Sequence, residues 1–92
     1  MGKFPPVYIG NVLVRLRKAS LKSQEQLAEE SDLSTRAIQE LEGNYQQPLI
    51  NTVYSIAKAL DMDPVEFFRL IIEDYEKNGK GSFSEEEDEG DL

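Results

Sequence analysis

Hydrophobic residues recur along most of the chain at spacings of three and four, which is the period of an amphipathic helix. The first such stretch predicts a helix within residues 7–19, with Arg15, Arg17 and Lys18 on its outer side. The positions expected to face the core are Tyr8 or Ile9, Val12, Leu13, Leu16 and Ala19.

A second, short helix is expected from Gln24 to about Glu30. Ser23, with Gln26 three residues later, has the pattern of a capping box that opens a helix. Leu27 and Ala28 would then face the core.

A third helix is expected from Thr35 to Glu42, with Ser34 as its N-cap and with Ile38 and Leu41 turned inward. Gly43-Asn44 closes it, because both residue types tolerate the left-handed conformation that ends helices. The connection from the second helix, Ser31 to Ser34, is too short for a hairpin and predicts a steep crossing. Asp32 is expected to be left-handed in this turn.

Two more helices complete the pattern. One runs from Ile50 or Asn51 to Leu60, and its core-facing residues are Val53, Ile56, Ala57 and Leu60. The other begins at the N-cap and first-turn proline of Asp63-Pro64 and lasts to about Glu76. No strand pattern is visible, so we expect an all-α fold.

The segment SQEQLAEESDLSTRAIQELEGN, followed by Pro48 and by SIAKALDMDPVEFF, resembles the Xre/Cro family of phage-repressor-type regulators. The resemblance spans about residues 9–68 without a gap. The positions that match in register are Gln24, Leu27, Ala28, Ser34, Ile38, Leu41, Glu42, Pro48, Ile56-Ala57 and Ala59-Leu60.

This sequence departs from the family pattern at three places. Ser31 and Asp32 stand where an apolar residue and then glycine are usual, and Gly43-Asn44 stands for the usual Asn-Gly. Tyr45 and Gln46 take positions that are often basic, which predicts weak binding to phosphate and a shallow salt dependence.

The resemblance implies a five-helix, phage-repressor-like DNA-binding domain whose helix-turn-helix places the third helix in the major groove of double-stranded DNA. It implies a dimer on a roughly palindromic operator. The DNA-binding residues carried over are Gln24, Ser34, Thr35, Arg36, Gln39, Glu40, Asn44, Tyr45 and Gln46.

Among these, the resemblance makes Thr35, Arg36 and Glu40 the base readers, for a thymine methyl, a guanine and a cytosine amino group respectively. Arg36 could instead remain solvated or contact a phosphate, and Glu40 could pair with Arg36 one turn earlier. Gln24 would contact a phosphate or serve only as polar capping, and Ser34 would cap the third helix near a phosphate. Asn44, Tyr45 and Gln46 would hold the DNA backbone, unless Tyr45 packs over Pro48.

The last helix has two apolar stripes, and a domain this small covers one of them more readily than both. One stripe holds Phe67, Leu70 and Ile71. The other predicts a homodimer interface formed by Phe68, Arg69, Ile72 and Tyr75, unless both stripes wrap the same core.

The net charge of −8 is unusual for a nucleic-acid binder, but it is unevenly distributed. Residues 80–92 carry six acidic residues and one lysine. We therefore expect residues 1–78 to form the helix-turn-helix DNA-binding domain, with a dimerisation helix at about 64–76, and residues 79–92 to form a disordered acidic tail. The tail would act as a solubilising end or as a nucleic-acid mimic that competes for the protein's own basic face.

Composition argues against other classes. The chain has no cysteine and no histidine, so thiolate zinc sites and the commonest general base are excluded, and we expect neither an enzyme nor a cofactor or metal. No apolar stretch approaches the length of a membrane span, and the lack of cysteine fits a cytoplasmic location.

The sequence thus predicts a sequence-specific transcriptional regulator, a dimeric repressor in the first instance. It is also similar to the controller proteins of restriction–modification systems, which activate as well as repress. The alternative is an antitoxin-like or other protein-interaction module with weak or no DNA binding, which the net acidity favours.

Overall fold

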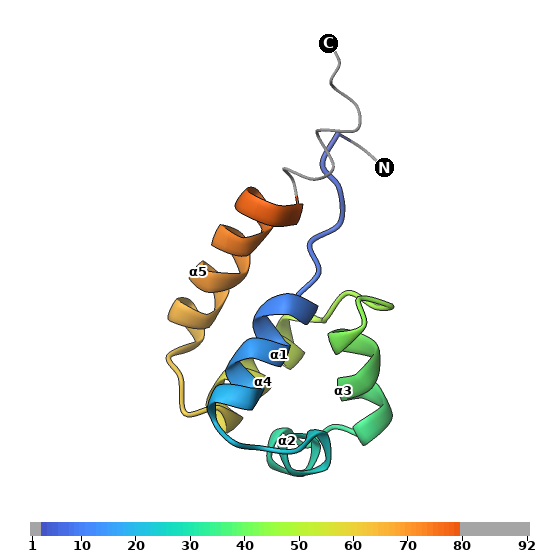
Figure 1. Ribbon diagram of the computed structural model, residues 1–92, viewed down its shortest axis with the longest axis vertical. Coiled ribbons are helices and arrows are strands. Elements are labelled where there is room, and N and C mark those ends of the chain that lie inside the picture. Colours follow the sequence, from blue (N-terminus) through green and yellow to red (C-terminus); the bar gives the residue numbers. More distant parts are fainter. Residues whose placement is uncertain (1–2, 80–92) are drawn as a thin grey trace.

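The computed structural model describes residues 3–79, and within that range the chain is helical and has no strand (Figure 1). The elements are α1 (Gly10–Ala19), α2 (Gln24–Ser31), α3 (Thr35–Glu42), α4 (Ile50–Ala59), α5 (Pro64–Asp74) and a short π-helical segment, η1 (Tyr75–Gly79). The expected all-α, five-helix architecture is confirmed. The predicted acidic tail lies outside the described residues from residue 80 onward.

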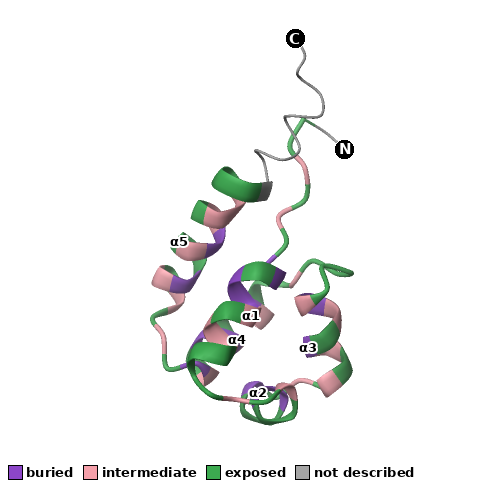
Figure 2. Ribbon diagram, viewed as in Figure 1, coloured by how far each residue is buried: buried purple, intermediate pink, exposed green. Residues whose placement is uncertain are grey.

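The helices are arranged around α1 and α4, with α5 on one side and α3 on the other (Figure 1). The pair α2–α3 packs closely, α2 also contacts α4, and α4 contacts α5. Buried positions turn toward the shared interior of these helices (Figure 2). The core residues are Ile9, Val12, Leu13, Leu27, Ala28, Ile38, Leu41, Val53, Ile56, Ala57, Leu60, Phe67 and Ile71.

The two helices of the expected helix-turn-helix begin at the serines that the sequence indicated. Ser23 Oγ accepts a hydrogen bond from the Gln26 amide at 3.0 Å, and Ser34 Oγ accepts one from the Ala37 amide at 3.0 Å. The capping box of α2 is only half formed, because the Gln26 side chain donates to Glu30 one turn further on. Each cap satisfies one of the amides that a helix start leaves without a partner.

The end of α2 accommodates an unusual residue. Ser31 belongs to the helix rather than to the turn and is buried, and its Oγ donates to the Leu27 carbonyl at 2.7 Å. The hydroxyl is therefore hydrogen-bonded at a position where an apolar side chain would only pack. The next residue, Asp32, is left-handed with φ of 61°, as predicted.

The exit from α3 differs from the expectation in one respect. Asn44 is left-handed with φ of 61°, but Gly43 has φ of −87°, so only one of the two residues uses the left-handed conformation. Leu21 and Asp61 are also left-handed, and each directly follows the C-cap residue of a helix, α1 and α4 respectively. The residue type does not predict a left-handed Leu21, because a leucine rarely adopts this conformation.

The start of α1 is also corrected by the structure. The helix begins at Gly10 and not near Val7, and Ala19, expected in the core, is exposed. Gly10 is buried against the end of α3, and its amide donates to Asn44 Oδ1 at 2.9 Å. A side chain at Gly10 would not fit, because a Cβ there would lie 2.4 Å from the Glu42 carbonyl oxygen.

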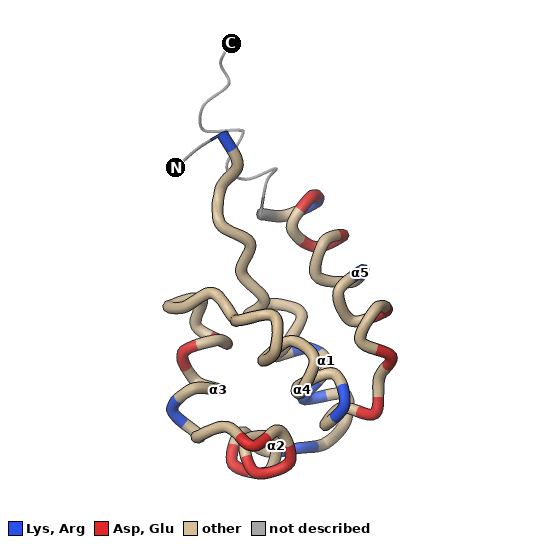
Figure 3. Tube along the Cα trace, turned by 180° about the vertical axis from the view of Figure 1, so that it is seen from behind, with Lys and Arg blue, Asp and Glu red and all other residues tan. Residues whose placement is uncertain are grey.

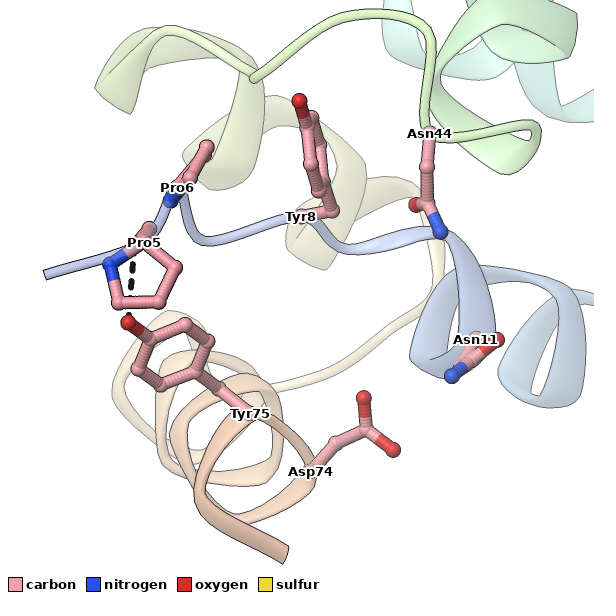
Figure 4. A pocket seen from close by; sticks show the side chains of 7 residues that line it. All are labelled: Pro5, Pro6, Tyr8, Asn11, Asn44, Asp74 and Tyr75. Carbon is pink, nitrogen blue, oxygen red and sulfur yellow. Dashed lines mark hydrogen bonds between the residues drawn. The ribbon is translucent and has the colours of Figure 1, made fainter. Parts of the chain in front are cut away.

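The segment before α1 lies along the end of α5. Tyr75 Oη donates to the Pro5 carbonyl at 2.8 Å and closes one side of a cavity of about 170 Å³ (Figure 4). The residues that line it are Pro5, Pro6, Tyr8, Asn11, Asn44, Asp74 and Tyr75.

α5 has one buried face and one more exposed face, as its two apolar stripes suggest. Asp63 caps the helix ahead of Pro64, as predicted, and Phe67 and Ile71 are fully buried. The α-helix ends at Asp74, two residues earlier than expected, and continues as η1. Within residues 3–79, none of the helices combines the length and apolar character needed to cross a lipid bilayer.

We predict that Gly10→Ala destabilises the fold by about 1–3 kcal/mol, because the added methyl group meets a backbone carbonyl that cannot move without shifting the end of α3. Gly43→Ala is the matched control. The close contact of its Cβ would be with the ring of Tyr45, an exposed side chain that can rotate away, and the Gln39 carbonyl oxygen would lie at an ordinary contact distance of 3.4 Å. Urea unfolding followed by circular dichroism gives both free energies, and equal losses for the two variants would contradict the close approach at Gly10.

Candidate nucleic-acid interface

An ion pair between α1 and α3 fixes the orientation of α3. Arg17 Nε donates to Glu42 Oε2 at 2.5 Å, and Arg17 Nη2 donates to Glu42 Oε1 at 3.1 Å. The side chains are only 12% and 7% exposed, and Arg17 Nη1 also donates to the Lys22 carbonyl. The hydrogen bond to Glu42 raises the pKa of the Arg17 guanidinium, so Arg17 remains charged.

The prediction that Arg17 lies on the outer side of the first helix is therefore wrong. A signal for its true position is present in the sequence, since Arg17 follows Leu13 by four residues and so lies on the same helical stripe. A charged residue on an apolar stripe needs a partner of opposite charge. The sequence does not identify Glu42 as that partner, because Glu42 is notable there only as a position that matches the family pattern.

The same carboxylate reaches α2 through Gln24. Gln24 Nε2 donates to Glu42 Oε1 at 2.9 Å, and Gln24 Oε1 accepts from Gln39 Nε2 at 3.3 Å. The side chain of Gln24 thus extends from the mostly buried ion pair to the exposed surface of α3. For Gln24 to contact a phosphate as predicted, its exposed hydrogen bond with Gln39 would have to break, or the phosphate would have to bind next to that bond.

The exposed surface of α3 carries a small groove lined by Arg36, Gln39, Glu40 and Tyr45. Arg36 is the most exposed of the expected base readers, with 81% of its side chain accessible. Arg36 Nε donates to Glu40 Oε2 at 3.0 Å, and this bond lowers the pKa of the Glu40 carboxyl. The pairing that the sequence left open for Glu40 is thus present in the structure.

Two further expected contacts lie at the N-terminus of the same helix. Ser34 caps α3, and Thr35 is its first residue and is half-buried. Apart from the Ala37 amide, which donates to Ser34 Oγ, the first amides of α3 have no partner within the helix. Such amides favour a phosphate oxygen.

The three expected contacts after α3 separate into two groups. Tyr45 lines the groove of α3 and is 81% exposed. Gln46 lies at the same groove, because its Nε2 donates to Glu40 Oε1 at 2.5 Å. The Oδ1 atom of Asn44 instead accepts a hydrogen bond from the Gly10 amide. Sequence reasoning missed this structural contact of Asn44, and the predicted contact of Asn44 with DNA stays a prediction.

Charge is distributed unevenly over the domain (Figure 3). Acidic residues gather on α2 and along α5, whereas basic residues follow α1 and the connection to α2. The exposed surface of α3 carries a single basic residue, Arg36, next to the acidic Glu40. Among residues 3–79, no three potential ligands are grouped to hold a metal ion.

The outer face of α5 contains the residues expected at a dimer interface. Phe68 is 48% exposed, Ile72 is half-buried, and exposed Arg69 pairs with both Glu66 and Glu73 on its own helix. Tyr75 is half-buried and already bonded to the N-terminal segment. Val65, which the sequence analysis did not include, is 75% exposed on the same helix.

The family model described as helix-turn-helix matches residues 13–67. No curated protein sequence matches the chain.

Several solved structures of the restriction-modification controller protein C.Esp1396I are similar. The wild-type protein is 28% identical and aligns over 83% of this chain and all of that one, with a TM-score of 0.70. A single-site mutant is 30% identical over 76% of this chain and 91% of that one, with a TM-score of 0.69. Another mutant, bound to its highest affinity operator site, is 29% identical over 75% of this chain and 91% of that one, with a TM-score of 0.68.

We predict that Glu42→Ala lowers the free energy of unfolding by about 2–4 kcal/mol, because it leaves the guanidinium of Arg17 mostly buried without its partner. Glu30→Gln is the matched control, since it removes a carboxylate from the ion pair between Lys22 and Glu30 at the surface. Pairs of that kind contribute little, so we expect almost no change. Similar losses in the two variants, measured by urea unfolding, would contradict the role given to the α1–α3 pair.

Proposed function

The chain belongs to the helix-turn-helix family, and we propose that it is a sequence-specific regulator of transcription that binds double-stranded DNA through α3. The observation that carries the proposal is the exposed surface of α3, where Arg36 projects beside the groove lined by Gln39, Glu40 and Tyr45. The likeness to a controller protein solved on its operator supports the same conclusion.

The chemistry of the exposed residues suggests how a site would be recognised. Arg36 can donate two hydrogen bonds to guanine in the major groove, and Thr35 can contact a thymine methyl group. The N-termini of α2 and α3 would hold phosphates, with Gln24 and Ser34 beside them. Tyr45 and Gln46 would contact the DNA backbone after α3.

A homodimer would provide the affinity that one recognition helix lacks. Arg36 is the only basic residue within α3, so each recognition helix contributes little nonspecific attraction to phosphate. A pair joined through Phe68, Arg69, Ile72 and part of Tyr75 on α5 could present two recognition helices to half-sites about one DNA turn apart, ~34 Å. Val65 extends the same apolar surface.

Regulation would then follow from where the operator lies. A dimer bound over a promoter would exclude RNA polymerase and repress, and one bound just upstream could activate, as controller-type regulators do. Such a protein would act in the cytoplasm, where bacterial-type operators are found. This mechanism needs no catalytic step and no cofactor.

One observation favours a second function, that of an antitoxin-like or other protein-interaction module. The exposed surface of α3 has as many acidic as basic residues, since Glu40 stands next to Arg36. A surface of this kind is poorly suited to phosphate and could contact a protein instead. The complete absence of duplex binding at low salt would favour this function over the first.

We predict that selection from random duplex DNA yields a roughly palindromic site and that Arg36→Ala binds it about 5- to 150-fold more weakly, which is the range for loss of a bidentate guanine contact. The preference for guanine should fall at one position of each half-site. Fluorescence anisotropy at several salt concentrations gives the affinities.

Lys58→Ala is the matched control, because it also removes one positive charge but lies at the end of α4, away from α3 (Figure 1). Equal losses for the two variants at every sequence would indicate that Arg36 contributes only general electrostatic attraction.

We predict that Phe68→Glu converts a dimer into a monomer, because the carboxylate would be buried without a partner in an apolar interface. Leu21→Glu is the matched control, since Leu21 is 90% exposed at the connection between α1 and α2. Sedimentation equilibrium at micromolar concentration measures both masses. A monomeric wild-type protein, or a dimeric Phe68→Glu variant, would contradict the interface.

A further inference from the structure

Glu40 holds two of the residues that are expected to contact DNA. Its Oε2 accepts from Arg36 Nε at 3.0 Å, and its Oε1 accepts from Gln46 Nε2 at 2.5 Å. One carboxylate thus joins a side chain of α3 to a side chain of the loop that follows. Both of its oxygen atoms are engaged before DNA is bound.

The bond to Arg36 uses only one part of the guanidinium. Nε is directed to Glu40, and among the described residues neither Nη1 nor Nη2 has a hydrogen-bond partner. The two terminal nitrogens are therefore available together for the O6 and N7 atoms of guanine. The ion pair also restrains the long arginine side chain, which reduces the conformational entropy lost on binding.

The negative charge of Glu40 acts differently on different DNA sequences. Its side chain is 28% exposed on the surface that would meet DNA, so it repels phosphate at any site. At a site with guanine under Arg36, that repulsion is offset by the oriented bidentate contact. At other sites the repulsion remains without this compensation.

We propose that Glu40 is a positioning residue that determines specificity: it orients Arg36 and Gln46 toward DNA and weakens binding to unrelated sequences, and it is not itself a base reader. The inference rests on the proposed function. A direct contact of Glu40 with a cytosine amino group would require the carboxylate to give up Gln46 or Arg36, and so to lose the arrangement in which the structure holds it.

The test is the isosteric variant Glu40→Gln, with selected and random duplexes as probes. A glutamine keeps the shape but removes the charge and weakens the hold on Arg36. We expect the preference for guanine, at the position identified by Arg36→Ala, to fall roughly threefold to tenfold, which is the net contribution of one typical hydrogen bond. We expect affinity for random duplex DNA at low salt to rise by a similar factor, roughly threefold to tenfold, as a surface repulsion is removed.

Asp61→Asn is the matched control. Asp61 is an exposed, left-handed residue between α4 and α5, and asparagine accepts the same backbone conformation while it removes the same charge. This variant should change neither the guanine preference nor, beyond a small uniform factor, the affinity for random DNA. Thermal unfolding of both variants verifies that the fold is retained.

The double variant Arg36→Ala with Glu40→Gln separates positioning from an independent contact. If Glu40 acts through Arg36, the double variant has the same base preferences as Arg36→Ala alone. A loss of preference in Glu40→Gln at a cytosine position, with the guanine preference intact, would overturn the inference in favour of direct reading. An unchanged guanine preference with stronger random binding would also overturn it, because Glu40 would then be a repulsive charge only.

Failure of the proposed function gives a different result. A wild-type protein that enriches no sequence from random duplexes would remove the DNA-binding proposal and this inference together. A wild-type protein that enriches a site which Glu40→Gln recognises with the same preferences would remove only the inference.

Discussion

The ion pair between Arg17 and Glu42 is the interaction on which the remainder of the domain depends. It is mostly buried, it joins α1 to the last residue of α3, and through Gln24 it also reaches the first residue of α2. Two short helices with a three-residue connection have few contacts of their own, so their orientation must be fixed by the helices behind them. One carboxylate with three hydrogen bonds does this at the point where α1, α2 and α3 meet. An ion pair suits this position because its geometry is directional, whereas apolar packing alone allows small rotations.

The end of α3 is fixed from a second direction by Asn44. Its left-handed backbone ends the helix, and its side chain accepts a hydrogen bond from the amide of Gly10, the first residue of α1. The close approach at Gly10 makes this contact possible. As a result Tyr45 and Gln46 leave the helix in a defined direction and return over the groove of α3. The position of the polar surface that would meet DNA is therefore determined by contacts that α3 and its C-terminal end make with α1.

The sequence predicted those features that depend on neighbouring residues. The serine caps of α2 and α3, the left-handed Asp32 and the proline start of α5 were all placed correctly, because each is determined within one helical turn. The sequence did not predict the partners of Arg17 and of Asn44, because these partners come from distant segments. A hydrophobic pattern contains no information about which polar groups meet. The candidate contacts on α3 were brought together as expected, but the shared binding of Arg36 and Gln46 by Glu40 depends on the path of the loop.

The bond between Tyr75 and the Pro5 carbonyl joins residues 70 positions apart, nearly the two ends of the described chain. The packing of α1 against α5 already closes most of this loop, so the bond holds only the short segment before Gly10, and one hydrogen bond with a few apolar neighbours offsets little of the entropy lost when that segment is ordered. The N-terminal segment should accordingly be the last part to dock during folding and the first to open in the native state. Because this segment continues directly into Gly10, its opening would loosen the start of α1 before it disturbed the buried ion pair. The domain would thus lose order from its N-terminal edge inward, while the pair α2–α3 remained folded.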